Sequence, residues 1–86
     1  MNKVVLNFWG TLKKPNKLLG DSIEIKKNET IYELLLRLDY KETEIEYINI
    51  YVNEREVRSD YVLNNEDIVD FFIHAGGGWI RGDDWN

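Results

Sequence analysis

The sequence predicts a small α+β domain in which one amphipathic helix covers one face of a mixed β-sheet. Three observations lead to this fold class. Alternating apolar runs lie near both ends of the chain, one helix with a clear start signal lies between them, and further short strands follow that helix. Neither a helix nor a sheet buries its apolar side alone, so the two must pack together. A length of 86 residues is enough for one such domain.

The first strand is predicted over Val4–Trp9, a run rich in β-branched and aromatic residues that Gly10 closes. Because side chains alternate between the two faces of a strand, and Asn7 is expected to face water, the remaining residues divide into two sets. The core-facing set is Val4, Leu6 and Phe8, and the opposite set is Val5 and Trp9. The segment Lys13–Gly20, with the single proline and three lysines, then predicts the loop of a wide hairpin, and Ser22–Lys26 its return strand.

The helix is predicted over Thr30–Leu38. Thr30 and Glu33 have the spacing of a capping box, in which each side chain binds the backbone N–H of the other residue. One apolar stripe follows at positions i, i+3, i+4 and i+7, formed by Ile31, Leu34, Leu35 and Leu38. The charged segment Asp39–Glu46 is interpreted as a connector.

After the helix the pattern returns to short strands. The expected elements are a strand at Ile48–Val52, a turn at Asn53–Arg55, a short edge strand at Glu56–Arg58, a core residue Leu63, a turn at Asn64–Asp67 and a last strand at Ile68–Ile73. In that last strand one face holds Val69, Phe71 and Ile73, and the other holds Ile68, Asp70 and Phe72.

The order strand, strand, helix, strand, short strand, strand is that of a β-grasp fold. The sequence contains no internal repeat and no second domain. We therefore expect a β-grasp domain over residues 1–75. Residues 76–86 are expected to form a flexible tail, made of the glycine run Gly76–Gly78 and an eight-residue C-terminal extension.

Composition excludes several classes of function. Without cysteine the chain has no disulfide, no thiolate nucleophile and no Cys-ligated zinc or iron–sulfur cluster, so it is no plant-type ferredoxin, although those proteins share the β-grasp architecture. No apolar stretch approaches the roughly 20 residues that span a bilayer, and the start has no signal-peptide layout, which predicts a cytoplasmic protein without a membrane partner. A net charge of −5 disfavours nucleic acid and favours a protein partner with a basic surface.

The chain resembles the ThiS/MoaD family of sulfur-carrier proteins, which have a ubiquitin-like β-grasp fold. The likeness runs from Val4 to Gly78, and the order and spacing of its pieces are more specific than any one of them. The pieces are Phe8–Leu12, Thr30–Leu35, Val52–Val57, Leu63–Val69 and the terminal Phe72–Gly78.

The resemblance implies a carrier rather than an enzyme. In this family the terminal glycine carboxylate is adenylated by a ubiquitin-activating-type enzyme that uses MgATP, and is then converted to a thiocarboxylate. The thiocarboxylate donates sulfur to a cofactor under construction. A molybdenum or tungsten pterin is expected here, because the long first-hairpin loop places the chain closer to the MoaD side, and thiamine or another cofactor stays open as the alternative. Gly77 and Gly78 would form the modified terminus. No cofactor would be bound permanently, and the partners would be the activating enzyme and a sulfur-accepting synthase.

Glycine suits such a terminus for a physical reason. A carboxylate that enters a buried adenylation site must travel along a narrow channel as extended backbone, and residues without Cβ are the narrowest. Residues 79–86 nevertheless follow Gly78, so a processing protease would have to remove them. Two alternatives stay open. The chain is a ubiquitin-like binding module whose tail, with Trp79 and Trp85, docks a partner, or it is a small protein modifier conjugated through Gly78.

The predicted outer face of the sheet holds a candidate docking surface. If the first and last strands pair, as a β-grasp requires, Val5, Trp9, Ile68 and Phe72 form one apolar patch. The functional interpretation, which the resemblance supports, is the contact with the activating enzyme, with Gly76 as a further contact. The alternative is that the tail or a loop of the same chain covers the patch.

Other candidate motifs favour plain surface roles. His74 is the single histidine, and without a nucleophile or metal partner it is interpreted as a surface residue. An oxygen-ligand metal site at Asp83 and Asp84 with Asp70 and Glu66 has no support from their spacing, so a solvated acidic surface is expected. The tripeptide Arg81-Gly82-Asp83 is interpreted as a coincidence.

Overall fold

The computed structural model describes residues 2–10, 12, 15, 18 and 20–73. In this part of the chain the elements follow the predicted order, with one short helix added. They are β1 (Lys3–Trp9), β2 (Ser22–Glu24), α1 (Ile31–Arg37), α2 (Glu42–Ile45), β3 (Ile48–Val52), β4 (Arg55–Val57) and β5 (Ile68–Ile73).

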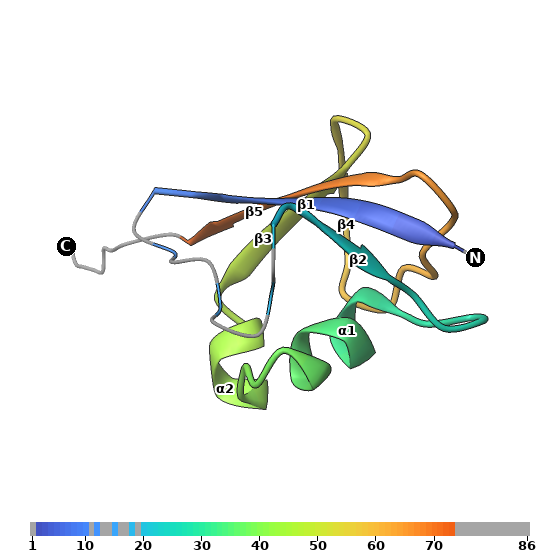
Figure 1. Ribbon diagram of the computed structural model, residues 1–86. Coiled ribbons are helices and arrows are strands. Elements are labelled where there is room, and N and C mark those ends of the chain that lie inside the picture. The colour runs from blue at the N-terminus through green and yellow to red at the C-terminus, as the bar shows by residue number, and fades with distance from the viewer. Residues whose placement is uncertain (1, 11, 13–14, 16–17, 19, 74–86) are drawn as a thin grey trace, which may run out of the picture.

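The strands form one mixed sheet in the order β2-β1-β5-β3-β4. The central strand β5 runs parallel to its neighbour β1, and the other neighbouring pairs run antiparallel. Both helices lie on the same side of this sheet, as Figure 1 shows, and the opposite face carries no helix of the described chain. The predicted β-grasp fold is confirmed.

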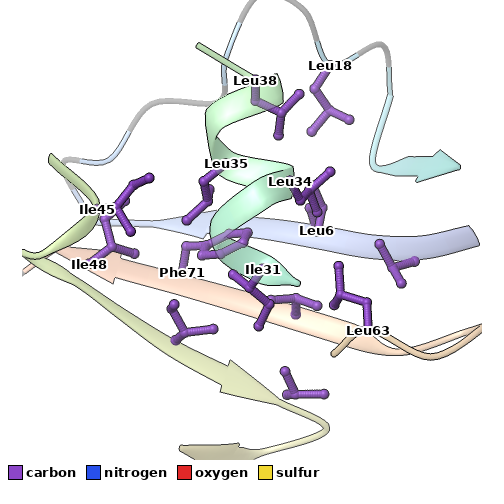
Figure 2. Packing of buried hydrophobic residues seen from close by; sticks show 14 of the residues in the cluster. Leu6, Leu18, Ile31, Leu34, Leu35, Leu38, Ile45, Ile48, Leu63 and Phe71 are labelled. Atoms are coloured by element: carbon purple, nitrogen blue, oxygen red, sulfur yellow. The ribbon is translucent and has the colours of Figure 1, made fainter. Parts of the chain in front are cut away.

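The core lies between α1 and the sheet. The helix contributes its predicted stripe, of which Ile31, Leu34 and Leu35 are fully buried and Leu38 is nearly so. Figure 2 shows these side chains packed against those of the strands, among which Leu6 and Phe71 are labelled. The strand residues of the core include those that alternation selected: Val4, Leu6, Ile50, Val52, Val69 and Phe71, with Phe8 and Ile73 packed on their margin.

The start of α1 has the predicted capping box. The Glu33 backbone N–H donates to Thr30 Oγ1 at 3.1 Å, and the Thr30 backbone N–H donates to Glu33 Oε1 at 2.9 Å. These two bonds satisfy N–H groups that have no partner inside the helix. The cap therefore fixes where the helix starts, and with it which residues face the sheet.

A two-residue turn joins β3 to β4 and is tied to the start of β5. Asn53 and Glu54 both have positive φ (50° and 73°). A two-residue turn with positive φ matches the right-handed twist of the strands it joins, and asparagine tolerates this region better than most residues. The Asn53 side chain donates to Asp67 Oδ1 at 3.0 Å and accepts the Ile68 backbone N–H at 3.0 Å. The turn thus holds β5 in register beside β3.

Some element bounds differ from the sequence-based expectation. The return strand β2 ends at Glu24 rather than Lys26, and β4 begins one residue earlier than predicted, at Arg55. The predicted connector Asp39–Glu46 does join the helix to the next strand, and it also contains the short helix α2. The Lys41 backbone N–H donates to Glu44 Oε1 at 2.8 Å, which caps this turn, and burial of Ile45 holds it on the core.

The hairpin loop also contributes to the core, which its composition did not indicate. Of the positions described in that loop, Leu12 and Leu18 are buried and belong to the core cluster. The Leu18 backbone N–H donates to the Pro15 carbonyl at 3.1 Å. Figure 2 shows Leu18 near Leu38 at one end of α1, so this loop closes that end of the core.

Candidate functional site

The candidate site begins where the central strand ends. β5 lies between β1 and β3, and its last residue is Ile73. The predicted modified terminus, Gly77 and Gly78, the neighbouring Gly76 and the surface residue His74 lie outside the described residues. The structure therefore shows that the strand before the glycine run lies in the middle of the sheet.

The four side chains of the predicted patch come together on the face opposite the helices. The parallel register of β1 and β5 pairs Val5 with Ile68 and Trp9 with Phe72. Trp9, Ile68 and Phe72 are 51%, 47% and 37% exposed, and Val5 is half-buried. The rings of Trp9 and Phe72 stack with their centroids 6.0 Å apart. We call these four residues the outer-face patch.

Asp70 lies in the middle of this face and orients its neighbours. Its Oδ1 atom accepts the Asn7 side-chain amide at 2.9 Å and the Trp9 indole Nε1–H at 3.1 Å. Asn7 and Asp70 are also direct partners in the register of β1 and β5. The carboxylate thus holds the Trp9 ring flat against the face, where it stacks on Phe72.

A groove extends the outer-face patch toward β3. It has a volume of about 510 Å³ and is lined by Asn49, Tyr51, Glu54, Asp70, Phe72 and Ile73. The Tyr51 ring meets the Phe72 ring edge-on, with centroids 5.5 Å apart. We call this hollow the outer-face groove.

The outer-face groove was not predicted from the sequence. Alternation in the third strand indicates that Asn49 and Tyr51 face away from the core. It does not indicate which residues of the last strand lie beside them. The register pairs Asn49 with Phe72 and Tyr51 with Asp70, and that pairing is a property of the folded sheet.

A second groove lies on the other side of the molecule, between α2 and the edge strand β4. Its volume is about 560 Å³, and Tyr32, Glu42 and Arg58 are among its lining residues. The Tyr32 hydroxyl donates to Glu42 Oε1, and this bond to a carboxylate raises the pKa of Tyr32. The lining of this groove includes no residue of β5 and none of the outer-face patch, so we do not assign it to the candidate site.

The remaining candidates have little structural support. Within residues 2–10, 12, 15, 18 and 20–73, no group of three or more acidic or histidine side chains is placed to hold a metal ion. Asp83 and Asp84 lie outside that part, and Asp70 binds Asn7 and Trp9 instead. No helix in the described part of the chain is long and apolar enough to cross a bilayer.

The fold and the site together define a class. A mixed five-stranded sheet carries its helices on one face, bears an apolar patch on the other, and sends its central last strand toward a glycine run. This is the architecture of a ubiquitin-like β-grasp protein, in which the fold is a platform and the chain end is the part that is presented.

The comparisons with known proteins narrow that class to a family. The model of the ThiS family matches residues 10–78, which is most of the chain and ends at the last glycine of the run. The chain belongs to the ThiS family. A comparison with curated proteins finds no significant match.

A solved structure supports the fold. A Pyrococcus furiosus protein, provisionally named molybdopterin converting factor subunit 1, is similar to this chain with a TM-score of 0.64. The match covers 85% of this chain and 98% of that protein, at 19% sequence identity. The family supports a sulfur-carrier role, since its members are small sulfur carriers rather than catalysts, and such carriers act with partner proteins.

Proposed function

We propose that this protein carries sulfur as a thiocarboxylate on Gly78, after a protease removes residues 79–86. The observation that carries this proposal is the match to the ThiS family, which runs to Gly78 and stops there. The position of β5 supports it, because the strand that precedes the glycine run is central in the sheet and therefore rigidly held. A rigid platform presents its chain end at a defined place to an enzyme.

The proposed chemistry needs a free carboxylate. An oxygen of the Gly78 carboxylate attacks the α-phosphorus of MgATP in the activating enzyme, pyrophosphate leaves, and an acyl-adenylate forms. Hydrosulfide then attacks the acyl carbon, AMP leaves, and loss of the sulfur-bound proton gives the thiocarboxylate. In the uncut chain the Gly78 carbonyl is part of the peptide bond to Trp79, and a peptide carbonyl has no anionic oxygen for the first step.

The receiving pathway belongs to the same proposal. We propose a synthase for a molybdenum or tungsten pterin as the sulfur acceptor, in line with the long first hairpin and with the name of the structural neighbour. The outer-face patch would contact the activating enzyme, because exposed apolar side chains gathered on one face are typical of a protein interface. A cytoplasmic location completes the proposal.

Pyrophosphate exchange with the activating enzyme of the same cell tests the proposal. We expect the chain that ends at Gly78 to support ATP–pyrophosphate exchange and the 86-residue chain to support none. Matched controls are a chain that ends at Trp79 and a Gly78-ended chain with Gly78→Val. Both should fail in exchange while they keep the circular dichroism spectrum of the folded domain.

The alternative, a binding module whose tail docks a partner, predicts the opposite dependence on the tail. Removal of residues 79–86 would then abolish partner binding. The mass of the protein isolated from its native cell separates the two. If all of it retains Asn86 and the Gly78-ended chain is never adenylated, the carrier proposal is wrong.

A further inference from the structure

The outer-face groove lies directly beside the end of the described chain. Phe72 and Ile73, the last two residues of β5, are part of its wall. The lining is partly aromatic, because the Phe72 ring contacts the Tyr51 ring within the groove and the Trp9 ring beside it. Any segment that follows Ile73 starts at the mouth of this groove.

The charged side chains that line the groove are all acidic. Two of its six lining residues, Glu54 and Asp70, are carboxylates, and none is basic. A segment that combines an aromatic ring with a cation therefore complements it. The ring would stack on Tyr51 and Phe72, and the cation would be attracted by the two carboxylates.

The same chain contains such a segment a few residues further on. Trp79, Ile80 and Arg81 follow the glycine run, and Arg81 is the single basic residue of the extension 79–86. The five residues 74–78 separate Ile73 from Trp79. A reverse turn takes four residues, and glycine adopts the positive φ values that turns often require, so this link is long enough for the chain to double back.

The spacing of side chains in the extension also matches the spacing of side chains along β5. In an extended segment, side chains two residues apart lie on the same side and are about 6–7 Å apart. Trp79 and Arg81 have this spacing, and so do Phe72 and Asp70 on β5. A segment that runs back along the groove, antiparallel to β5, therefore places Trp79 over Phe72 when it places Arg81 beside Asp70.

We propose that Trp79, Ile80 and Arg81 of the uncut chain occupy the outer-face groove and cover the outer-face patch. The occupant is the chain's own extension. Its consequence for activation rests on the proposed function: one cut after Gly78 would both create the carboxylate and uncover the surface that the activating enzyme contacts. Activation of the uncut chain would then be prevented for two reasons. The Gly78 carboxylate does not exist, and the extension covers the surface that the activating enzyme contacts.

Nuclear magnetic resonance of the 86-residue chain and of the chain ending at Gly78 tests the docking without any enzyme. We expect different chemical shifts at the Trp9 indole N–H and at the Tyr51 and Phe72 backbone amides. Amides on the helix side, such as that of Leu35, should stay the same. Differences confined to the residues next to the cut would overturn the proposal.

A charge exchange tests whether Arg81 lies in the acidic groove. In the 86-residue chain, Arg81→Glu should remove the shift differences, and Glu54→Lys together with Arg81→Glu should restore them. The matched control is Glu46→Lys with Arg81→Glu, because Glu46 is exposed on α2, on the other side of the sheet. Equal restoration by both pairs would show that Arg81 makes no specific contact with the groove and would overturn the proposal.

Two further experimental results distinguish this inference from its alternatives. If the shift differences grow with protein concentration, a second copy occupies the groove and the proposal is wrong. Its failure is also distinguishable from that of the proposed function. A Gly78-ended chain that supports exchange, alongside an 86-residue chain with an uncovered face, would keep the carrier and remove the occlusion.

Discussion

Two carboxylates, Glu29 and Asp67, are buried among the described residues and are fastened by donors. Glu29 accepts from the Arg37 guanidinium through both of its oxygens, at 2.9 and 3.0 Å, and from the Lys26 backbone N–H. Asp67 accepts from Asn53, Tyr61 and the Asn64 backbone N–H. Each carboxylate thus has several hydrogen-bond donors, and these offset the cost of burying its charge.

The Glu29 carboxyl predicts a specific loss of stability in acid. Burial by itself raises its pKa, but the hydrogen bonds from Arg37 and Lys26 outweigh burial, so the pKa lies below its ordinary value of 4.5. The folded state therefore binds this proton less readily than the unfolded state. The stabilisation is fully present above the unfolded pKa and is lost as the pH falls through the lower folded pKa.

We therefore expect Glu29→Gln to lower the free energy of unfolding at pH 7 by about 1–3 kcal/mol. The variant should also lose part of the wild-type decline of stability that occurs as the pH falls below 4.5, the ordinary pKa of this carboxyl. Urea unfolding at several pH values measures both effects. The exposed Glu46→Gln is the control and should keep the wild-type profile, whereas identical profiles for Glu29→Gln and wild type would contradict the assignment.

At the scale of the element, α1 is a seven-residue helix whose stability depends on packing. A helix of this length is not stable alone in water, so its buried face must hold it. Leu35 is fully buried on that face, whereas the next residue, Leu36, is 40% exposed. The two leucines thus provide a matched pair on the same turn.

Leu35→Ala should lower the free energy of unfolding by about 2–5 kcal/mol, because it leaves a cavity between α1 and the sheet. Leu36→Ala should cost about 1 kcal/mol or less, since Leu36 stays 40% exposed in the folded domain and lies outside the core. Thermal or urea unfolding of both variants measures the difference. Equal costs would mean that α1 does not pack on the sheet as described.

At the scale of the whole molecule, the two faces of the sheet have different roles. The helices cover one face and bury the core, and the other face holds the outer-face patch and groove. A substitution on the second face can therefore change binding while stability stays almost the same. This separation permits a test of the patch as an interface.

Ile68→Ala in the Gly78-ended chain should raise the KM for this chain in pyrophosphate exchange about fivefold, a loss of about 1 kcal/mol of binding energy. The kcat should stay unchanged, because the side chain contributes to docking and not to chemistry. Val62→Ala is the matched control, since Val62 is 45% exposed but belongs to a bridge with Thr30, the N-cap of α1. Equal effects on KM would argue against the patch.

The sequence by itself determined the features that depend on local chemistry and periodicity. The Thr30–Glu33 cap, the apolar stripe of α1 and the alternation of β1 and β5 follow from residues close together in the chain, and the structure confirms each. The outer-face patch was also predictable, because a β-grasp requires its first and last strands to pair. The modified glycine terminus stays a prediction that rests on the resemblance, and the family match ends at Gly78.

Only the tertiary structure decided which distant side chains meet. The outer-face groove depends on the register of β3 against β5, and a shift of β3 by one residue would turn Asn49 and Tyr51 to the core face. Asp70 as the acceptor for Trp9 and Asn7, Leu12 and Leu18 in the core, and α2 inside a charged connector have the same origin. Each depends on contacts between segments far apart in sequence, and the residue pattern of one segment does not indicate which other segment it contacts.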